Sequence, residues 1–220
     1  MPTAGLDEAG RGPVIGPMVI AGVILSPDAA KKLKRMGVRD SKLLPPERRE
    51  ELEPMIKELA DAYAVRVVEP KRIDDAVTRN ELNALEAEVM AEIILELKPS
   101  MVIVDAPGRN TDKFKRILKS KLGGVPVRVR AENKADVRFV HVAAASILAK
   151  VERDRKVAEL RARAGYDFGS GYPGDPRTKE FLLKVLSGFP FPKDQIRWKW
   201  ATMQNLLNER RRASLTDFME

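Results

Sequence analysis

Short apolar runs alternate with longer segments of helical periodicity along this chain. Runs rich in β-branched residues predict five strands, one ending near Asp7 and the others at 19–25, 63–68, 101–105 and 125–129. Apolar positions spaced by three or four residues predict helices at 73–97 and 137–164, and a helix started by a proline that includes 52–59. Further helices are predicted at 29–36, after a Ser-Pro-Asp start, and at 111–122, 178–186 and 199–212. Residues 166–178 are rich in glycine and proline and predict a loop.

Two acids stand where the first apolar segment meets a glycine-rich turn. Asp7 and Glu8 are followed by Gly10, Arg11 and Gly12. Such a turn leaves backbone N–H groups free to approach a ligand, and an arginine adds a forked donor suited to phosphate or a sugar hydroxyl. Because neighbouring side chains of a regular strand point to opposite faces, the two acids can share a metal only if Glu8 lies at a strand end or a bulge. A solvated acid pair before a turn is the alternative.

The turn matches neither of two common phosphate-binding motifs completely. A P-loop is excluded because no Gly-Lys-Ser/Thr follows the glycines. A dinucleotide fingerprint is half matched by Gly10, Gly12 and Gly16, with Asp28 at a plausible distance for a ribose contact. That fingerprint requires a helix after the glycines, whereas residues 17–25 favour a strand. A dinucleotide-dependent enzyme therefore stays an alternative. A helix after Gly12 would support it, and a strand there would exclude it.

Two further acids occupy positions that favour chemistry. Asp105 ends the apolar run 101–105, and open α/β sheets place catalytic groups at the carboxyl ends of their strands. It can meet Asp7 if their strands are neighbours, although an aspartate before Pro-Gly also favours a plain turn. Asp136 lies near the start of helix 137–164, where capping is the alternative to metal binding. We expect His141, five residues on, to be structural.

Composition narrows the chemistry of any metal site. The 220 residues include no cysteine and one histidine, which excludes disulfides, thiolate zinc sites, cysteine nucleophiles and multi-histidine sites. A bound metal must then use oxygen ligands, which favours Mg²⁺ or Mn²⁺. The net charge of +8, with 33% charged residues, predicts a surface that attracts polyanions, nucleic acid above all.

The sequence predicts no targeting or membrane segment. The N-terminus has acids where a signal peptide needs a basic and then an apolar segment, and the longest apolar run, 14–25, is interrupted by Pro17 and too short to span a bilayer. We expect a soluble cytoplasmic protein with one sizeable core.

The segment GLDEAGRGPVIGP, residues 5–17, resembles the signature of the archaeal-type type 2 ribonucleases H (RNase HII). The resemblance extends to about residue 179 and includes KAD, residues 134–136, followed by AAASILAKVERD. It implies an α/β, RNase H-like fold: a mixed five-stranded sheet with its first three strands antiparallel, flanked by helices, and a helical C-terminal extension. The implied division is a catalytic domain at 1–164 and a substrate-binding extension at 165–220.

The resemblance also implies a reaction and its residues. It implies hydrolysis of the RNA strand of RNA/DNA hybrids and cleavage on the 5′ side of ribonucleotides embedded in duplex DNA, leaving a 3′-hydroxyl and a 5′-phosphate. The residues that would hold two ions, Mg²⁺ or Mn²⁺, are Asp7, Glu8, Asp105 and Asp136. Those that would sense the ribose 2′-hydroxyl are Gly10, Arg11, Gly12 and Tyr172, with Tyr166 as the alternative tyrosine. Lys42, in an Asp-Ser-Lys segment, is the candidate phosphate contact.

The C-terminal region leaves alternatives open. Arg197 to Trp200 interleave cations with aromatics, which suits packing on a phosphate backbone or, as we favour, tryptophans in the core. The last residues faintly resemble the sliding-clamp (PCNA) binding peptide of some archaeal relatives through Leu215 and Phe218, although Arg212 and Met219 depart from it. We expect a monomer. The alternative function is a non-catalytic nucleic-acid-binding module, which would not need the four acids.

Overall fold

The computed structural model describes residues 2–39 and 43–217, with side chains up to residue 212. The chain divides into two compact units. The first comprises Met1–Ala9, Met18–Val68 and Leu82–Asp154, and the second comprises Gly10–Pro17, Glu69–Glu81 and Arg155–Glu220. Each unit is assembled from three separate stretches of sequence. The division into domains at residue 164 stays a prediction.

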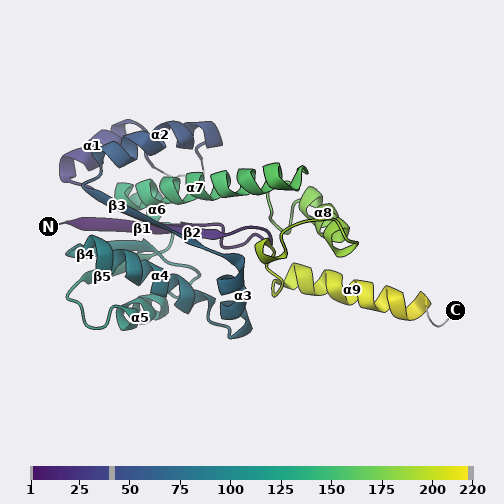
Figure 1. Ribbon diagram of the computed structural model, residues 1–220. Coiled ribbons are helices and arrows are strands. Elements are labelled where there is room, and N and C mark those ends of the chain that lie inside the picture. Colours follow the sequence, from purple (N-terminus) through teal and green to yellow (C-terminus); the bar gives the residue numbers. More distant parts are fainter. Residues whose placement is uncertain (1, 40–42, 218–220) are drawn as a thin grey trace. The chain divides into compact units, whose positions relative to one another are not determined.

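The first unit is built on a mixed sheet of five strands in the order β3, β2, β1, β4, β5 (Figure 1). β1 (Thr3–Ala9), β2 (Met18–Ile24) and β3 (Ala62–Val68) pair antiparallel. β4 (Met101–Asp105) and β5 (Arg128–Glu132) extend the sheet parallel to β1. Every residue of β2 is buried, as expected for a strand covered on both faces. The predicted mixed sheet, with its first three strands antiparallel, is confirmed.

Three helices cover one face of this sheet (Figure 1). They are α1 (Pro27–Arg35), α2 (Pro46–Leu59) and the first part of α7 (Val140–Ala164). Their apolar side chains form one cluster with Val19, Ala21 and Val23 of β2. These odd-numbered residues share a face because side chains alternate along a strand.

The opposite face of the sheet is covered by α4 (Leu82–Leu97), with α5 (Thr111–Lys121) beside it (Figure 1). Gly22 makes room for α4, since a Cβ atom on Gly22 would lie 2.5 Å from Cγ2 of Ile93. A single turn of helix, α6 (Ala135–Arg138), follows β5. The central strand β2 is therefore covered on both faces, whereas the edge strand β3 leaves Tyr63 and Val67 exposed.

Two predicted helices are interrupted in the structure. The helix predicted at 73–97 is wrong as one element: it is α3 (Pro70–Thr78) and α4, because Asn80 adopts a left-handed φ of 56° between them. The helix predicted at 137–164 begins at Val140 as α7, because Phe139 is extended (φ −123°, ψ 116°). Neither break involves a glycine or proline, the residues from which interruptions are usually predicted.

Two predicted boundaries are also displaced. The fifth strand begins at Arg128 rather than at 125, because Pro126 has no N–H for a strand ladder and the Val127 N–H donates to the carbonyl of Val125 within a turn. The last helix, α9 (Ala201–Asp217), extends beyond the predicted 199–212.

The second unit has a core of its own, centred on Phe181. Its ring lies 5.0–5.5 Å from four other aromatic rings, those of Tyr166, Phe168, Phe189 and Phe191. The helices of this unit are α3, the end of α7 from Arg155, α8 (Pro176–Leu186), the short 3-10 helix η1 (Lys193–Gln195) and α9. Trp198 and Trp200 are partly buried and pack against this core, which agrees with the role favoured for them.

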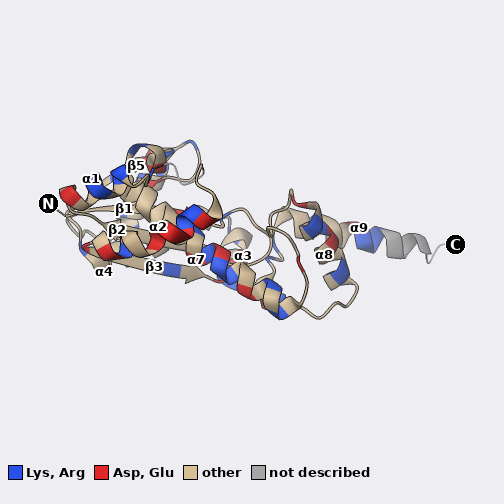
Figure 2. Cartoon of the chain, turned by 90° about the horizontal axis from the view of Figure 1, so that it is seen from above, with Lys and Arg blue, Asp and Glu red and all other residues tan. Residues whose placement is uncertain are grey.

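Charges of both signs are interspersed along helices such as α2 and α7 (Figure 2). α1 and α5 differ, because each carries one acidic residue and several Lys or Arg residues. No helix in the described part of the chain is long and apolar enough to cross a membrane.

Candidate active site

Two of the predicted acids lie at the carboxyl ends of neighbouring strands. β1 and β4 pair in parallel up to Leu6 and Val104, so Asp7 and Asp105 follow at the same level of the sheet. Aligned residues of neighbouring parallel strands project toward the same face. The condition under which these acids can meet, that their strands be neighbours, is fulfilled.

Asp136 lies in the segment after β5, and a hydrogen bond links that segment to the carboxyl end of β4. The carboxylate of Asp105 accepts a hydrogen bond from the Ala135 N–H, with an N to Oδ1 distance of 2.9 Å. Asp105 therefore satisfies the N–H of Ala135, the first residue of α6, and Asp136 is the second residue of that helix rather than its N-cap, which is Lys134. This bond holds the backbone next to Asp136 beside Asp105, and the side chain of Asp136 is buried.

Glu8 lies one residue before the end of β1. The pairing with β2 is regular there, with Asp7 opposite Ala21 and Glu8 opposite Ile20, so no bulge is present. The pairing stays regular to Ala9, the last residue of β1, which lies opposite Val19, so neither the bulge nor the irregular strand end expected at Glu8 is present. The Asp7 carboxylate accepts a hydrogen bond from the Glu8 N–H at 2.8 Å. The charge of Glu8 raises the pKa of Asp7.

α7 packs against β1 beside Asp7. Gly5 lies two residues before Asp7 on the same strand face, and a Cβ atom on it would be 2.1 Å from the carbonyl carbon of His141. Further along α7, Ser146 forms a hydrogen bond with the Asp7 carboxylate, and the charge of Lys150 acts on that carboxylate. Lys150 Nζ donates to Ser146 Oγ at 2.5 Å. Sequence reasoning missed both residues, although their four-residue spacing puts them on one helix face.

The Asp7 carboxylate is buried among other negative charges. Burial raises the pKa of Asp7 well above its usual range, and the charges of Glu8 and Asp105 raise it further. The charge of Lys150 and the hydrogen bond with Ser146 oppose this rise without cancelling it. A divalent cation would relieve the repulsion among these acids, so the electrostatics favour cation binding.

The donor set fits a hard divalent cation. Carboxylate oxygens without thiolates are the ligands that Mg²⁺ and Mn²⁺ prefer. Among the side chains that the structure describes, no three from Asp, Glu or His are arranged as a group that could hold a metal ion. The assignment of these acids as metal ligands therefore stays a prediction.

In the second unit, the glycine-rich turn at 10–12 lies against Tyr172. A Cβ atom on Gly12 would be 3.4 Å from Cε1 of the Tyr172 ring. The Val14 N–H donates to the carbonyl of Gly171 at 2.8 Å, which ties the turn to the segment that carries Tyr172. The Tyr172 side chain is 41% exposed, so its ring is accessible to a ligand.

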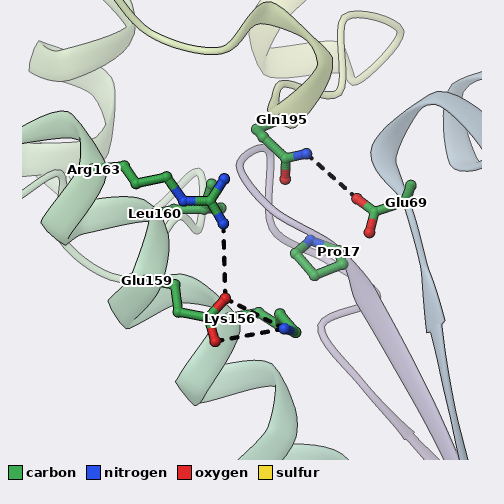
Figure 3. Close-up of a pocket in the computed structure, with 7 residues that line it drawn as sticks. All are labelled: Pro17, Glu69, Lys156, Glu159, Leu160, Arg163 and Gln195. Carbon is green, nitrogen blue, oxygen red and sulfur yellow. Dashed lines mark hydrogen bonds and ion pairs between the residues drawn. The ribbon is translucent and has the colours of Figure 1, made fainter.

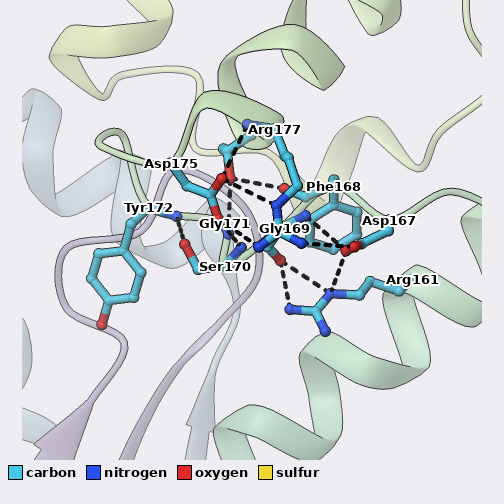
Figure 4. A network of polar contacts seen from close by, with 10 residues as sticks. Arg161, Asp167, Phe168, Gly169, Ser170, Gly171, Tyr172, Asp175 and Arg177 are labelled. Atoms are coloured by element: carbon cyan, nitrogen blue, oxygen red, sulfur yellow. Dashed lines mark hydrogen bonds and ion pairs between the residues drawn. The ribbon is translucent and has the colours of Figure 1, made fainter.

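Polar contacts fix the tyrosine loop, residues 169–175 (Figure 4). Asp175 accepts hydrogen bonds from the backbone N–H groups of Ser170 at 2.8 Å and Arg177 at 3.0 Å. These contacts, the Ser170 backbone N–H foremost, lower the pKa of Asp175. Thr178 Oγ1 accepts from the Gly171 N–H at 3.0 Å. Tyr166, the alternative tyrosine, instead stacks on Phe181 at 5.2 Å and serves the core.

A pocket of about 220 Å³ opens elsewhere in the second unit (Figure 3). It is lined by Pro17, Glu69, Lys156, Glu159, Leu160, Arg163 and Gln195. Its charged groups engage one another: Lys156 Nζ lies 3.3 Å and an Arg163 nitrogen 3.8 Å from Glu159 Oε2, and Gln195 donates to Glu69. Cations and acids therefore offset each other, and we assign no chemistry to this pocket.

Three predicted contact residues fall outside the described side chains: Lys42, Leu215 and Phe218. The dinucleotide alternative, in contrast, is settled. β2 begins at Met18, so the element after the glycines is a strand where that fingerprint requires a helix. The dinucleotide interpretation is wrong.

The family model described as Ribonuclease HII matches residues 4–203. The chain belongs to the ribonuclease HII family. Ribonuclease HII of Pyrococcus abyssi is 41% identical over 218 residues, covering 98% of this chain and 96% of the relative. Ribonuclease HII of Archaeoglobus fulgidus is 42% identical over 215 residues, covering 98% and 99%. The resemblance seen in residues 5–17 is therefore confirmed across nearly the whole chain.

Solved structures support the same assignment. The crystal structure of ribonuclease H2 from Pyrococcus horikoshii OT3 matches with a TM-score of 0.86 and 40% identity, covering 96% of this chain and 99% of that one. The ribonuclease HII in the PCNA complex from Archaeoglobus fulgidus matches with a TM-score of 0.81 and 42% identity, covering 91% and 95%. The crystal structure of Bst-RNase HIII in complex with Mn²⁺ matches with a TM-score of 0.79 and 22% identity, covering 96% of this chain and 71% of that one. This match supports the fold. As a ribonuclease HII family member, the chain is a metal-dependent ribonuclease H, a phosphodiester hydrolase.

Proposed function

We propose that this ribonuclease HII family member hydrolyses the RNA strand of RNA/DNA hybrids and also cuts duplex DNA on the 5′ side of an embedded ribonucleotide. The products would be a 3′-hydroxyl and a 5′-phosphate. The observation that carries the proposal is the pair of acids Asp7 and Asp105, which end neighbouring parallel strands. The raised pKa of Asp7 supports it, because burial and the charges of Glu8 and Asp105 favour a cation at this edge of the sheet.

The residues proposed to hold Mg²⁺ or Mn²⁺ are Asp7, Glu8, Asp105 and Asp136. When bound, two such ions supply an activated water and stabilise the leaving oxygen of an in-line displacement. The carboxylates themselves need not accept protons. Ser146 and Lys150 would hold the Asp7 carboxylate in place, since one bonds to it and the other donates to Ser146 at 2.5 Å.

Recognition of the ribose is assigned to the turn and to the tyrosine beside it. Because RNA differs from DNA in its 2′-hydroxyl, the enzyme must sense that group. Gly10, Arg11 and Gly12 offer backbone N–H groups, and Tyr172 offers an exposed ring next to Gly12. Lys42 is proposed as a contact to the phosphate backbone.

A protein partner is proposed for the C-terminal residues. The relative from Archaeoglobus fulgidus has been solved in a PCNA:RNase HII complex. By analogy, Leu215 and Phe218 would contact a sliding clamp, although Arg212 and Met219 depart from the usual peptide. The protein itself would be a monomer acting in the cytoplasm.

The test is cleavage of a DNA duplex that contains one ribonucleotide, in Mg²⁺, in Mn²⁺ and in EDTA, with an all-DNA duplex alongside. We expect a single cut 5′ of the ribonucleotide in either metal, and no cut in EDTA or in the all-DNA duplex. Asp7→Asn should abolish the cut, whereas Asp28→Asn, whose side chain is 97% exposed on α1, should leave it unchanged. Binding without cleavage by the wild type in both metals would overturn the proposal and favour a binding module.

A further inference from the structure

Arg197 is a buried cation whose donors are directed at the glycine-rich turn. Its side chain is 0% exposed. NH2 donates to the carbonyl of Gly10 at 2.6 Å, NH1 to that of Arg11 at 2.8 Å, and NH2 to that of Gly16 at 3.0 Å. A charge is costly to bury unless it is hydrogen-bonded. These carbonyls therefore stabilise the guanidinium, and the guanidinium fixes the turn.

Trp200 holds the next carbonyl of the same turn. Its indole Nε1–H donates to the carbonyl of Gly12 at 2.9 Å. The Arg197 guanidinium lies over the Trp200 ring, 5.1 Å from its centroid, so the two side chains also brace each other. Together they hold three consecutive carbonyls, those of Gly10, Arg11 and Gly12.

Holding these carbonyls determines where the N–H groups point. In a planar trans peptide the C=O and the following N–H point in opposite directions. The bonds to the carbonyls of Gly10 and Arg11 therefore direct the N–H groups of Arg11 and Gly12 away from Arg197. The carbonyl of Gly12 is followed by Pro13, which has no N–H. Gly12 itself is exposed and lies beside the Tyr172 ring.

We infer that Arg197 and Trp200 are positioning residues for sugar recognition. They aim the N–H groups of Arg11 and Gly12 at the 2′-hydroxyl of the substrate and so set the preference for a ribonucleotide over a deoxyribonucleotide. Neither side chain needs to touch the substrate. This inference rests on the proposed function, since it takes the turn at 10–12 as the part that senses the sugar.

The chain offers a matched pair of variants. Trp198 is the control for Trp200: both rings pack partly buried against the same core, and both indole N–H groups donate to a backbone carbonyl. The carbonyl bonded by Trp198 is that of Lys193, at 2.8 Å, outside the turn. Trp200→Phe and Trp198→Phe thus each remove one similar hydrogen bond, and only the first loosens the turn.

The experiment compares two constants for each variant: kcat/KM on a duplex with one ribonucleotide, and the inhibition constant of an all-DNA duplex as competitor. For W200F we expect kcat/KM to fall by about 2- to 10-fold, the size of one lost neutral hydrogen bond, with the inhibition constant unchanged. For W198F we expect neither to change. R197K keeps the charge but loses the forked donor. It should lower kcat/KM on the ribonucleotide-containing duplex more than W200F does.

A merely structural role would move both constants together. Equal effects of W200F and W198F, or a parallel weakening of the all-DNA competitor in W200F, would overturn the inference, whether or not R197K folds. Failure of the proposed function is distinguishable, because the wild type itself would then leave the ribonucleotide duplex uncut.

Discussion

Replacing Gly5 by alanine puts a methyl group where β1 and α7 leave no space. The added carbon would lie 2.1 Å from the carbonyl carbon of His141, 2.4 Å from its oxygen and 2.3 Å from the nitrogen of Val142. Favourable contacts between such atoms begin at about 3.5 Å, so helix and strand must separate by on the order of 1 Å. All three neighbours are backbone atoms, so no side-chain rotation can relieve the clash.

We expect G5A to lose about 3 kcal/mol of unfolding free energy, the upper end of the usual range for overpacked cores. For a chain of this size, that loss lowers the melting temperature by about 6–12 °C. The matched control is Gly174→Ala, because a Cβ atom there meets nothing within 4 Å. A glycine-to-alanine change in open space is neutral, or stabilising by up to about 1 kcal/mol.

Urea unfolding followed by circular dichroism compares both variants with the wild type. Folded G5A should also cleave more slowly, because α7 carries Ser146 and Lys150 to the Asp7 carboxylate. If G5A unfolds at the same urea concentration as G174A and cleaves as fast as the wild type, α7 does not press on β1 as described, and the reasoning is refuted.

Two other substitutions test the electrostatics. Asp7→Asn should abolish cleavage yet leave the protein at least as stable as the wild type in EDTA at pH 7, because the raised pKa of Asp7 means that its ionised form costs stability above that pKa. Thermal melts in EDTA check this. The melting temperature of the wild type should rise relative to that of the variant as the pH falls toward 4, and a variant that melts at a lower temperature than the wild type at pH 7 would contradict the prediction. Asp175→Ala should raise KM by freeing the tyrosine loop. Because the pKa of Asp175 is lowered, its stabilisation is present above its usual pKa of about 3.9 and is lost below it. Acid titrations of stability should therefore be less steep for D175A, and parallel curves would argue against this role.

The acids at the carboxyl ends of the strands could be predicted, because the end of an apolar run in the sequence marks the end of a strand. Asp105 ends an apolar run, and parallel pairing of β4 with β1 brings it level with Asp7. Ser146 and Lys150 escaped prediction, because the face that α7 turns toward Asp7 depends on the close approach at Gly5, a tertiary contact. The break at Asn80 could not be predicted for a related reason. Asparagine can adopt the left-handed conformation seen there, but whether it does depends on the surrounding structure.

Contacts between distant residues in the second unit were the least predictable. Tyr172 was placed beside the turn only through the family resemblance, because nothing in the spacing of Gly12 and Tyr172 relates them. Arg197 looked like one member of a run of cations and aromatics. Its burial, and its bonds to carbonyls about 180 residues earlier, follow from how the second unit packs.

The central claim is that ions held by these carboxylates contact the phosphate on the 5′ side of a ribonucleotide. It is tested most directly with a duplex whose scissile phosphate carries sulfur in place of one non-bridging oxygen. Mg²⁺ is the harder ion and binds sulfur poorly, whereas Mn²⁺ tolerates it better. For at least one of the two stereoisomers, the account predicts slow cleavage in Mg²⁺ that Mn²⁺ restores. Cleavage that is impaired equally in both metals, for both stereoisomers, would contradict it.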